Sequence, residues 1–183
     1  MSYAYRIKLE SLTSTVEQKG QWQVNLMDIL PLSEMQALLR SALLNLGWSE
    51  EDGTIVTEID GIRCALSEEK MTVEAKISEE VFAEHTVVGD SDDSQTLRAA
   101  RLEQGHEEHI KKLEKQESHV NRLLTQQLLM IEPKLKEVLD RATHEVHAQA
   151  LKLKASRLGE VQSIKESTGE DGELEITIHV KVH

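Results

Sequence analysis

The sequence is poor in the residue types that mark several large classes of protein. It has one cysteine, Cys64, among 183 residues, so no disulfide framework is available and the chain fits a reducing compartment. Aromatic residues make up only 3 percent, so a core must be built from Leu, Ile, Val and Ala. No apolar run approaches the roughly 20 residues of a membrane-spanning helix. These absences predict a soluble, cytoplasmic protein.

Positive charge is also scarce. The chain has 21 Lys and Arg against 33 Asp and Glu, a formal net charge of −12. Nucleic acids and anionic membranes both require clustered Lys and Arg, so neither is expected as a partner. The sequence has no Gly-rich phosphate loop, Gly-x-Ser-x-Gly or Cys-x-x-Cys motif. We therefore expect no cofactor and no enzymatic activity.

What the sequence does have is a long helix-forming stretch, residues 91–158. Most of its residues are Glu, Lys, Gln, Arg, Leu and Ala, which favour helix. Its apolar residues recur at steps of mostly three and four, as on one face of a helix. Residues 90–94 precede it with acidic and serine N-cap candidates, and Gly159 follows it.

Pro133 lies inside this stretch without a loop signal around it. Proline removes a helical hydrogen bond, so the residues predict either a kinked continuous helix or two helices that meet with Pro133 at the first turn of the second. Within the N-terminal segment 91–118, residues 101–118 are too polar for a core helix. This segment is expected to be either a solvated, projecting arm or a partner-bound helix.

The remaining elements are short. We expect strands at 3–9 and 22–26 joined by a polar linker, and a helix that begins at Ser33 with a capping box to Gln36. A meander follows from residue 54 with a hairpin at Asp60-Gly61, then a transition over 78–88 and a C-terminal strand over 174–182. The order predicts a single α+β domain, 1–183, with a mainly antiparallel sheet in a β-α-β-β-α-β-like order.

Histidine is the one residue type that suggests chemistry. Two His-Glu-x-His sequences occur in the long stretch, and residues three apart share a helix face and can ligate one metal. The spacing differs from the His-Glu-x-x-His of zinc proteases, so solvated or structural histidines are the favoured interpretation. A metal-binding protein or metalloenzyme is the alternative function, with the candidate ligands His106, His109, His144 and His147.

Two segments resemble a known group of proteins. One is Leu44-Asn45-Leu46-Gly47-Trp48 before the meander. The other is Gly159 with Val161-Gln162-Ser163-Ile164, Gly169-Glu170-Asp171-Gly172-Glu173 and the final strand. Together they resemble accessory domains of bacterial FtsH-type AAA+ ternary systems, and small uncharacterised proteins of cyanobacteria and plastids. The resemblance implies an accessory role beside an AAA+ ATPase and carries no catalytic residue.

The leading hypothesis is therefore an adaptor or assembly protein that interacts through its long helix. The partner is either an AAA+ ATPase or a second copy in a homo-oligomer. The residues expected to form the contact are apolar side chains in the first half of the stretch, namely Ile110, Leu113, Val120 and Leu124.

Molar mass from light scattering during size exclusion tests this hypothesis. Assembly through an apolar helix face should persist in a chelator, because no metal contributes to it. Assembly through the histidine pairs should instead dissociate when a chelator removes the metal. A monomer in both conditions would contradict homo-oligomer formation.

Overall fold

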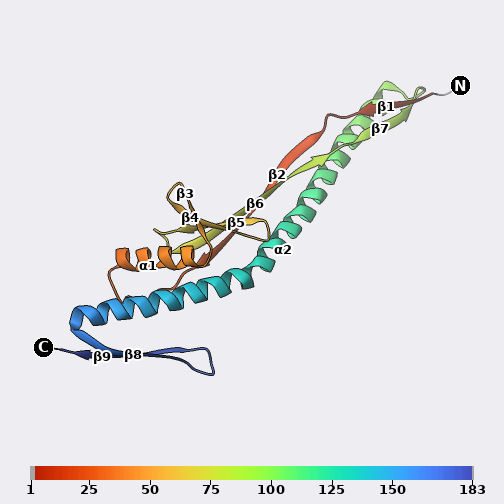
Figure 1. Cartoon of the computed structure of the whole chain (residues 1–183). Helices are drawn as coiled ribbons and strands as arrows, with labels where there is room; N and C mark the ends of the chain where they lie inside the picture. Colours follow the sequence, from red (N-terminus) through yellow and green to blue (C-terminus); the bar gives the residue numbers. More distant parts are fainter. Residues whose placement is uncertain (1–2, 183) are drawn as a thin grey trace. The chain divides into compact units, whose positions relative to one another are not determined.

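The computed structural model describes residues 3–182, and the α+β class is confirmed (Figure 1). Its elements are β1 (Ala4–Lys8), β2 (Leu12–Gln23), α1 (Leu32–Asn45), β3 (Ser49–Glu51), β4 (Thr54–Ile59), β5 (Ile62–Ser67), β6 (Thr72–Ala83), β7 (Thr86–Asp90), α2 (Gln95–Leu158), β8 (Glu160–Thr168) and β9 (Leu174–Lys181). The strands form three sheets, with orders β1-β7, β2-β6-β5-β4-β3 and β8-β9. Neither described helix has a segment long and apolar enough to cross a bilayer.

Helix α2 is continuous over 64 residues and includes Pro133 in its interior. Of the two alternatives for Pro133, the continuous helix is therefore the one observed. Ser94 caps the helix, since its Oγ accepts a hydrogen bond from the N–H of Leu97 at 3.2 Å. At the other end Gly159 follows Leu158 directly, as the sequence predicts.

The chain divides into two compact units. The first comprises 1–19 and 76–129, and the second comprises 20–75 and 130–183. Strands β2 and β6 and helix α2 contribute residues to both units. The prediction of a single domain over 1–183 stays a prediction.

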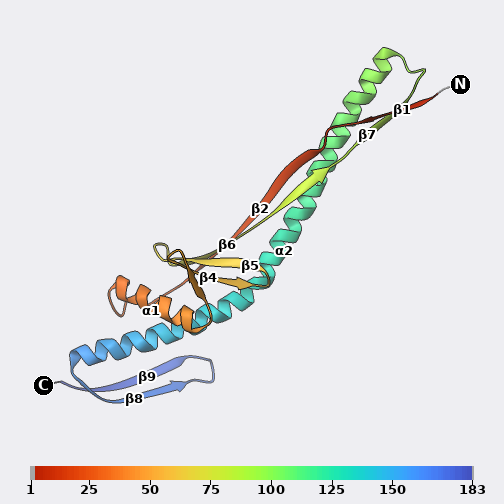
Figure 2. The ribbon, with the colours of Figure 1, turned by 45° about the horizontal axis from the view of Figure 1, so that its top comes forward.

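In the first unit, the β1–β7 pair lies along the N-terminal part of α2 (Figure 2). The two strands are antiparallel, and their register runs from Ala4 opposite Asp90 to Lys8 opposite Thr86. Helix α2 approaches strand β7 closely at Gly105, where an added Cβ would overlap Val87. The buried His109 then donates from Nε2 to the carbonyl oxygen of Ala83 at 2.7 Å. Part of segment 91–118 thus packs on strands of its own unit.

In the second unit, α1 and the meander supply the core. Met35, Leu39 and Leu43 of α1 are almost fully buried. The Asp60-Gly61 hairpin prediction is confirmed, because Ile59 pairs with Ile62 and both turn residues have positive φ, 51° and 79°. The other buried core residues of the meander are Ile55, Val56, Ile62, Cys64, Leu66, Val73 and Ala75.

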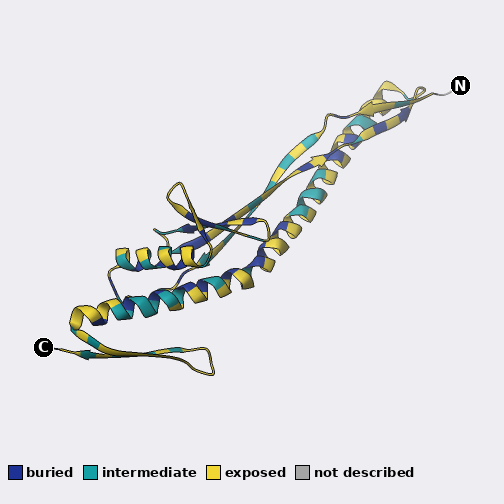
Figure 3. Cartoon of the chain, viewed as in Figure 1, coloured by how far each residue is buried: buried dark blue, intermediate teal, exposed yellow. Residues whose placement is uncertain are grey.

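The C-terminal half of α2 belongs to the second unit and buries one face (Figure 3). Its buried residues are Ile131, Leu135, Leu139, Ala142, Val146, Ala150 and Ala155. Two ion pairs hold it at the surface. Lys134 contacts Asp60 of the hairpin at 2.7 Å, and Arg157 contacts Glu34 of α1 at 2.5 Å.

Several local predictions are wrong. The N-cap of α1 is Pro31 and no side chain caps the helix; Gln36 Nε2 instead donates to the carbonyl oxygen of Glu68. The expected linker before residue 22 is part of the 12-residue β2, and the transition over 78–88 is occupied by the end of β6 and most of β7. In β2 polar residues alternate with half-buried ones, so the segment lacks the apolar period of a buried strand.

The close approach at Gly105 gives a test of packing in the first unit. Gly105→Ala should destabilise the protein by about 1–2 kcal/mol, because the new methyl group overlaps the stiff, β-branched side chain of Val87. In a Val87→Ala background the same substitution should be neutral or stabilising by about 0.5–1 kcal/mol, since alanine favours helix. Urea unfolding of the four proteins measures both effects, and equal effects in the two backgrounds would contradict the contact.

Candidate interaction surface

The four predicted contact residues differ in accessibility. Ile110 is 52% exposed, whereas Leu113 and Val120 are half-buried. Leu124 is 3% exposed and is a core residue. An accessible apolar contact on this part of α2 can therefore include Ile110, Leu113 and Val120, while Leu124 contributes to folding.

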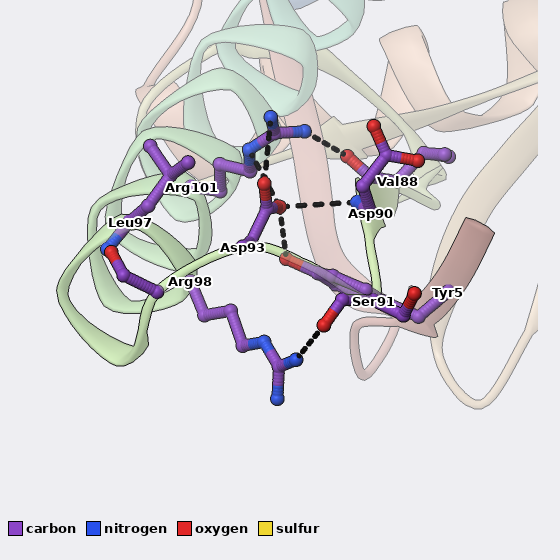
Figure 4. A network of polar contacts seen from close by, with 9 residues as sticks. Tyr5, Val88, Asp90, Ser91, Asp93, Leu97, Arg98 and Arg101 are labelled. Carbon is purple, nitrogen blue, oxygen red and sulfur yellow. Dashed lines mark hydrogen bonds and ion pairs between the residues drawn. The ribbon is translucent and has the colours of Figure 1, made fainter. Parts of the chain in front are cut away.

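A polar network fixes the start of α2 (Figure 4). The carboxylate of Asp93, whose side chain is only 8% exposed, lies 3.2 Å from Nε of Arg101 and accepts hydrogen bonds from the Tyr5 hydroxyl and the Asp90 N–H. Arg101 also donates to the carbonyl oxygen of Val88 at 3.1 Å. The acidic stretch before α2 thus joins the helix to β1 and β7, and its central carboxylate is engaged within the protein.

The first histidine pair is divided between surface and core. His106 is exposed, whereas His109 is 1% exposed and donates from Nε2 to Ala83. The His109 ring stacks on His85 with centroids 6.0 Å apart, and His85 lies 3.5 Å from Glu108. A ring held in this way has a structural role, which matches the favoured interpretation for His109.

The second pair lines a pocket of about 340 Å³ in the second unit. His147 Nε2 accepts a hydrogen bond from the N–H of Met27 at 3.0 Å, so its proton is on Nδ1. Burial, and then the charge of His144, hold the pKa of His147 below 6.5. In the described part of the chain, no three His, Cys, Asp or Glu residues are placed to hold a metal. The geometry therefore gives no specific support to the metal-binding alternative.

Cys64 is also unsuited to chemistry. The thiol is buried, and burial raises its pKa to about 11. At neutral pH it is protonated and a weak nucleophile. Its position on β5, in register with Thr57 and Ala75, is that of a core residue.

Sequence reasoning missed a basic groove on the first unit. The groove has a volume of about 560 Å³ and lies between the end of β6 and the middle of α2. Its lining includes an aromatic side chain, four basic side chains and one carboxylate: Phe82, Lys112, Lys115, His119, Arg122 and Glu80. The basic residues are spaced by three, four and three, so they share one helix face. That spacing was the available signal, and the surrounding glutamates obscured it.

The pKa of His147 gives a pH test of the second unit. Because its pKa is lowered on folding, the unfolded chain binds more protons below about pH 6.5, so stability should fall as the pH drops through this range. His147→Gln should reduce this loss, while the exposed His106→Gln should leave it unchanged. Urea unfolding between about pH 5 and 8 measures how the free energy of unfolding changes with pH in each protein. An unchanged slope in His147→Gln would refute the assignment.

Comparison with known proteins gives one family. Searches of curated proteins and of solved structures give no match to the chain. The family described as FtsH ternary system domain X5 matches over residues 1–182. This match confirms the resemblance to accessory domains of FtsH ternary systems and extends it from the two ends of the chain to the intervening helix. The chain belongs to the FtsH ternary system domain X5 family.

Proposed function

We propose that this chain is a non-enzymatic, cytoplasmic adaptor or assembly component of an FtsH-type AAA+ protease system, and that it contacts a protein partner through helix α2. The observation that carries the proposal is the family match over residues 1–182. A component of a multi-protein system must present a surface to other proteins. The partner is taken to be a protein of that system, with a second copy of the chain as the alternative.

The accessible apolar side chains of α2 support this mode of contact. In the first unit Ile110 is 52% exposed, and Leu113 and Val120, three and ten residues further along, are half-buried on the same helix face. Single exposed apolar residues are ordinary, but a set on one helix face provides the apolar anchors that helix-mediated recognition uses. The buried Cys64 and the hydrogen-bonded His109 and His147 favour a binding role over nucleophilic or acid–base catalysis.

The proposal predicts a measurable complex with the FtsH-type protease of the same genome. Ile110→Ser should weaken binding about fivefold, equivalent to roughly 1 kcal/mol, because about half of the side chain is accessible for burial. Leu129→Ser is the matched control on the same helix, since Leu129 is 60% exposed and was not among the predicted contacts. Biolayer interferometry with both purified proteins gives the affinities.

Each outcome of this experiment is informative. Weaker binding by Ile110→Ser but not by Leu129→Ser supports contact through the predicted face. Equal affinities for all three proteins would remove Ile110 from the interface. A wild-type chain that neither binds the protease nor changes its degradation of an unfolded substrate would overturn the proposed partner.

A further inference from the structure

The basic groove on the first unit stands out against the charge of the chain. The protein carries a net charge of −12, yet the groove is lined by three permanent cations, Lys112, Lys115 and Arg122, and by one carboxylate, Glu80. Like charges repel when they are this close, so their grouping on one face has a cost in the free protein. An anionic ligand would offset that cost.

The cations retain capacity to bind. Lys112 donates to the carbonyl oxygen of Glu84 at 2.7 Å, which positions its ammonium group without neutralising it. Lys115 and Arg122 are exposed and form no ion pair with any residue in the described range 3–182. The guanidinium group of Arg122 has a planar set of donors suited to a carboxylate.

The groove also has apolar and hydrogen-bonding features. Two apolar residues line the groove. Phe82 of β6 is 56% exposed, and Val120 of α2 is half-buried. The buried Oε1 of Gln116 has no hydrogen-bond partner within the described chain. An unsatisfied buried acceptor is costly, and a peptide N–H in the groove would satisfy it once the Gln116 side chain turns into the groove. A ligand that fits must combine negative charge, an apolar group and hydrogen-bond donors.

We infer that the groove binds an acidic, extended peptide segment of a partner protein, with an apolar side chain of that segment seated against Phe82. An Asp- and Glu-rich peptide provides carboxylates for Lys115 and Arg122 and a backbone N–H for Gln116. A short acidic segment fits better than a nucleic acid, because a long phosphate backbone would extend beyond the groove onto the surface of a chain whose net charge is −12. This inference rests on the proposed protein-binding function and specifies the chemistry of a second contact.

Fluorescence anisotropy with the full chain tests the inference. The probe is a fluorescein-labelled peptide of Asp and Glu residues with one central leucine, and the control peptide has Asn and Gln in place of every acid. The acidic peptide should bind, and its affinity should fall several-fold as salt is raised from about 50 to 300 mM, because salt screens exposed charge pairs. The neutral peptide should bind at least about tenfold more weakly.

Variants locate the binding site. The double substitution Lys115→Glu and Arg122→Glu should weaken binding about tenfold or more, because it replaces two attractive contacts with repulsive ones. Lys154→Glu with Lys165→Glu is the matched control, since it makes the same charge change at exposed residues of the second unit. Phe82→Ala should weaken binding about fivefold, while Leu129→Ala, also exposed, should not. Circular dichroism of each variant verifies folding.

Several results would overturn the inference. The inference is wrong if the acidic peptide does not bind. It is also wrong if both double variants lose affinity equally, because net charge alone would then explain the loss. If a single-stranded RNA of equal charge binds more tightly than the peptide, the groove is a nucleic-acid site. If the chain self-associates with rising concentration and the Lys115→Glu, Arg122→Glu variant does not, the groove binds a second copy of the chain. If the acidic peptide does not bind but protease binding still depends on Ile110, the proposed function holds and only the assignment of the groove is wrong.

Discussion

The structure depends on burying one face of a single helix. Helix α2 contributes core residues to both units, from Gly105 and His109 in the first to Val146 and Ala150 in the second. Isolated helices gain little from propensity alone, so most of the stability of α2 must come from this packing. Pro133 is tolerated within it because the core residues on either side, Ile131 and Leu135, are 1% and 0% exposed. The burial of these two side chains offsets the free-energy cost of the backbone hydrogen bond that Pro133 cannot form.

The character of the buried face changes along the helix. In the second unit its residues are Leu, Ile, Val and Ala, so hydrophobic burial drives the contact. In the first unit the same face begins with a glycine and a histidine. Gly105 permits close approach to Val87, and His109 donates a hydrogen bond to the carbonyl oxygen of the buried Ala83. A polar helix segment is thereby held against strands with few large apolar side chains.

This change explains what the sequence predicted well and what it did not. The Asp60-Gly61 hairpin and the end of α2 directly before Gly159 follow from local chemistry, and both are observed. The packing of residues 105–109 depends on a glycine and a histidine, which no apolar period reveals. Residues 12–21 of strand β2 were missed for a related reason, since their Thr, Gln and Glu side chains resemble a linker until a sheet covers one side. Of the predicted contact residues, Leu124 illustrates the same limit, because a heptad-like pattern does not distinguish a core face from an exposed one.

Net charge was the least informative guide to the candidate site. A value of −12 describes the average surface, whereas recognition depends on the field within about one Debye length, roughly 8–10 Å, of a contact. Lys112, Lys115 and Arg122 outnumber Glu80 in the lining of the groove, so the formal charge of that lining is opposite in sign to the net charge of the chain. An acidic surface around a basic groove would repel most anionic molecules at long range and favour those whose shape brings carboxylates into the groove. Such an arrangement gives specificity through repulsion as well as attraction, which suits a component that must select one partner within a multi-protein system.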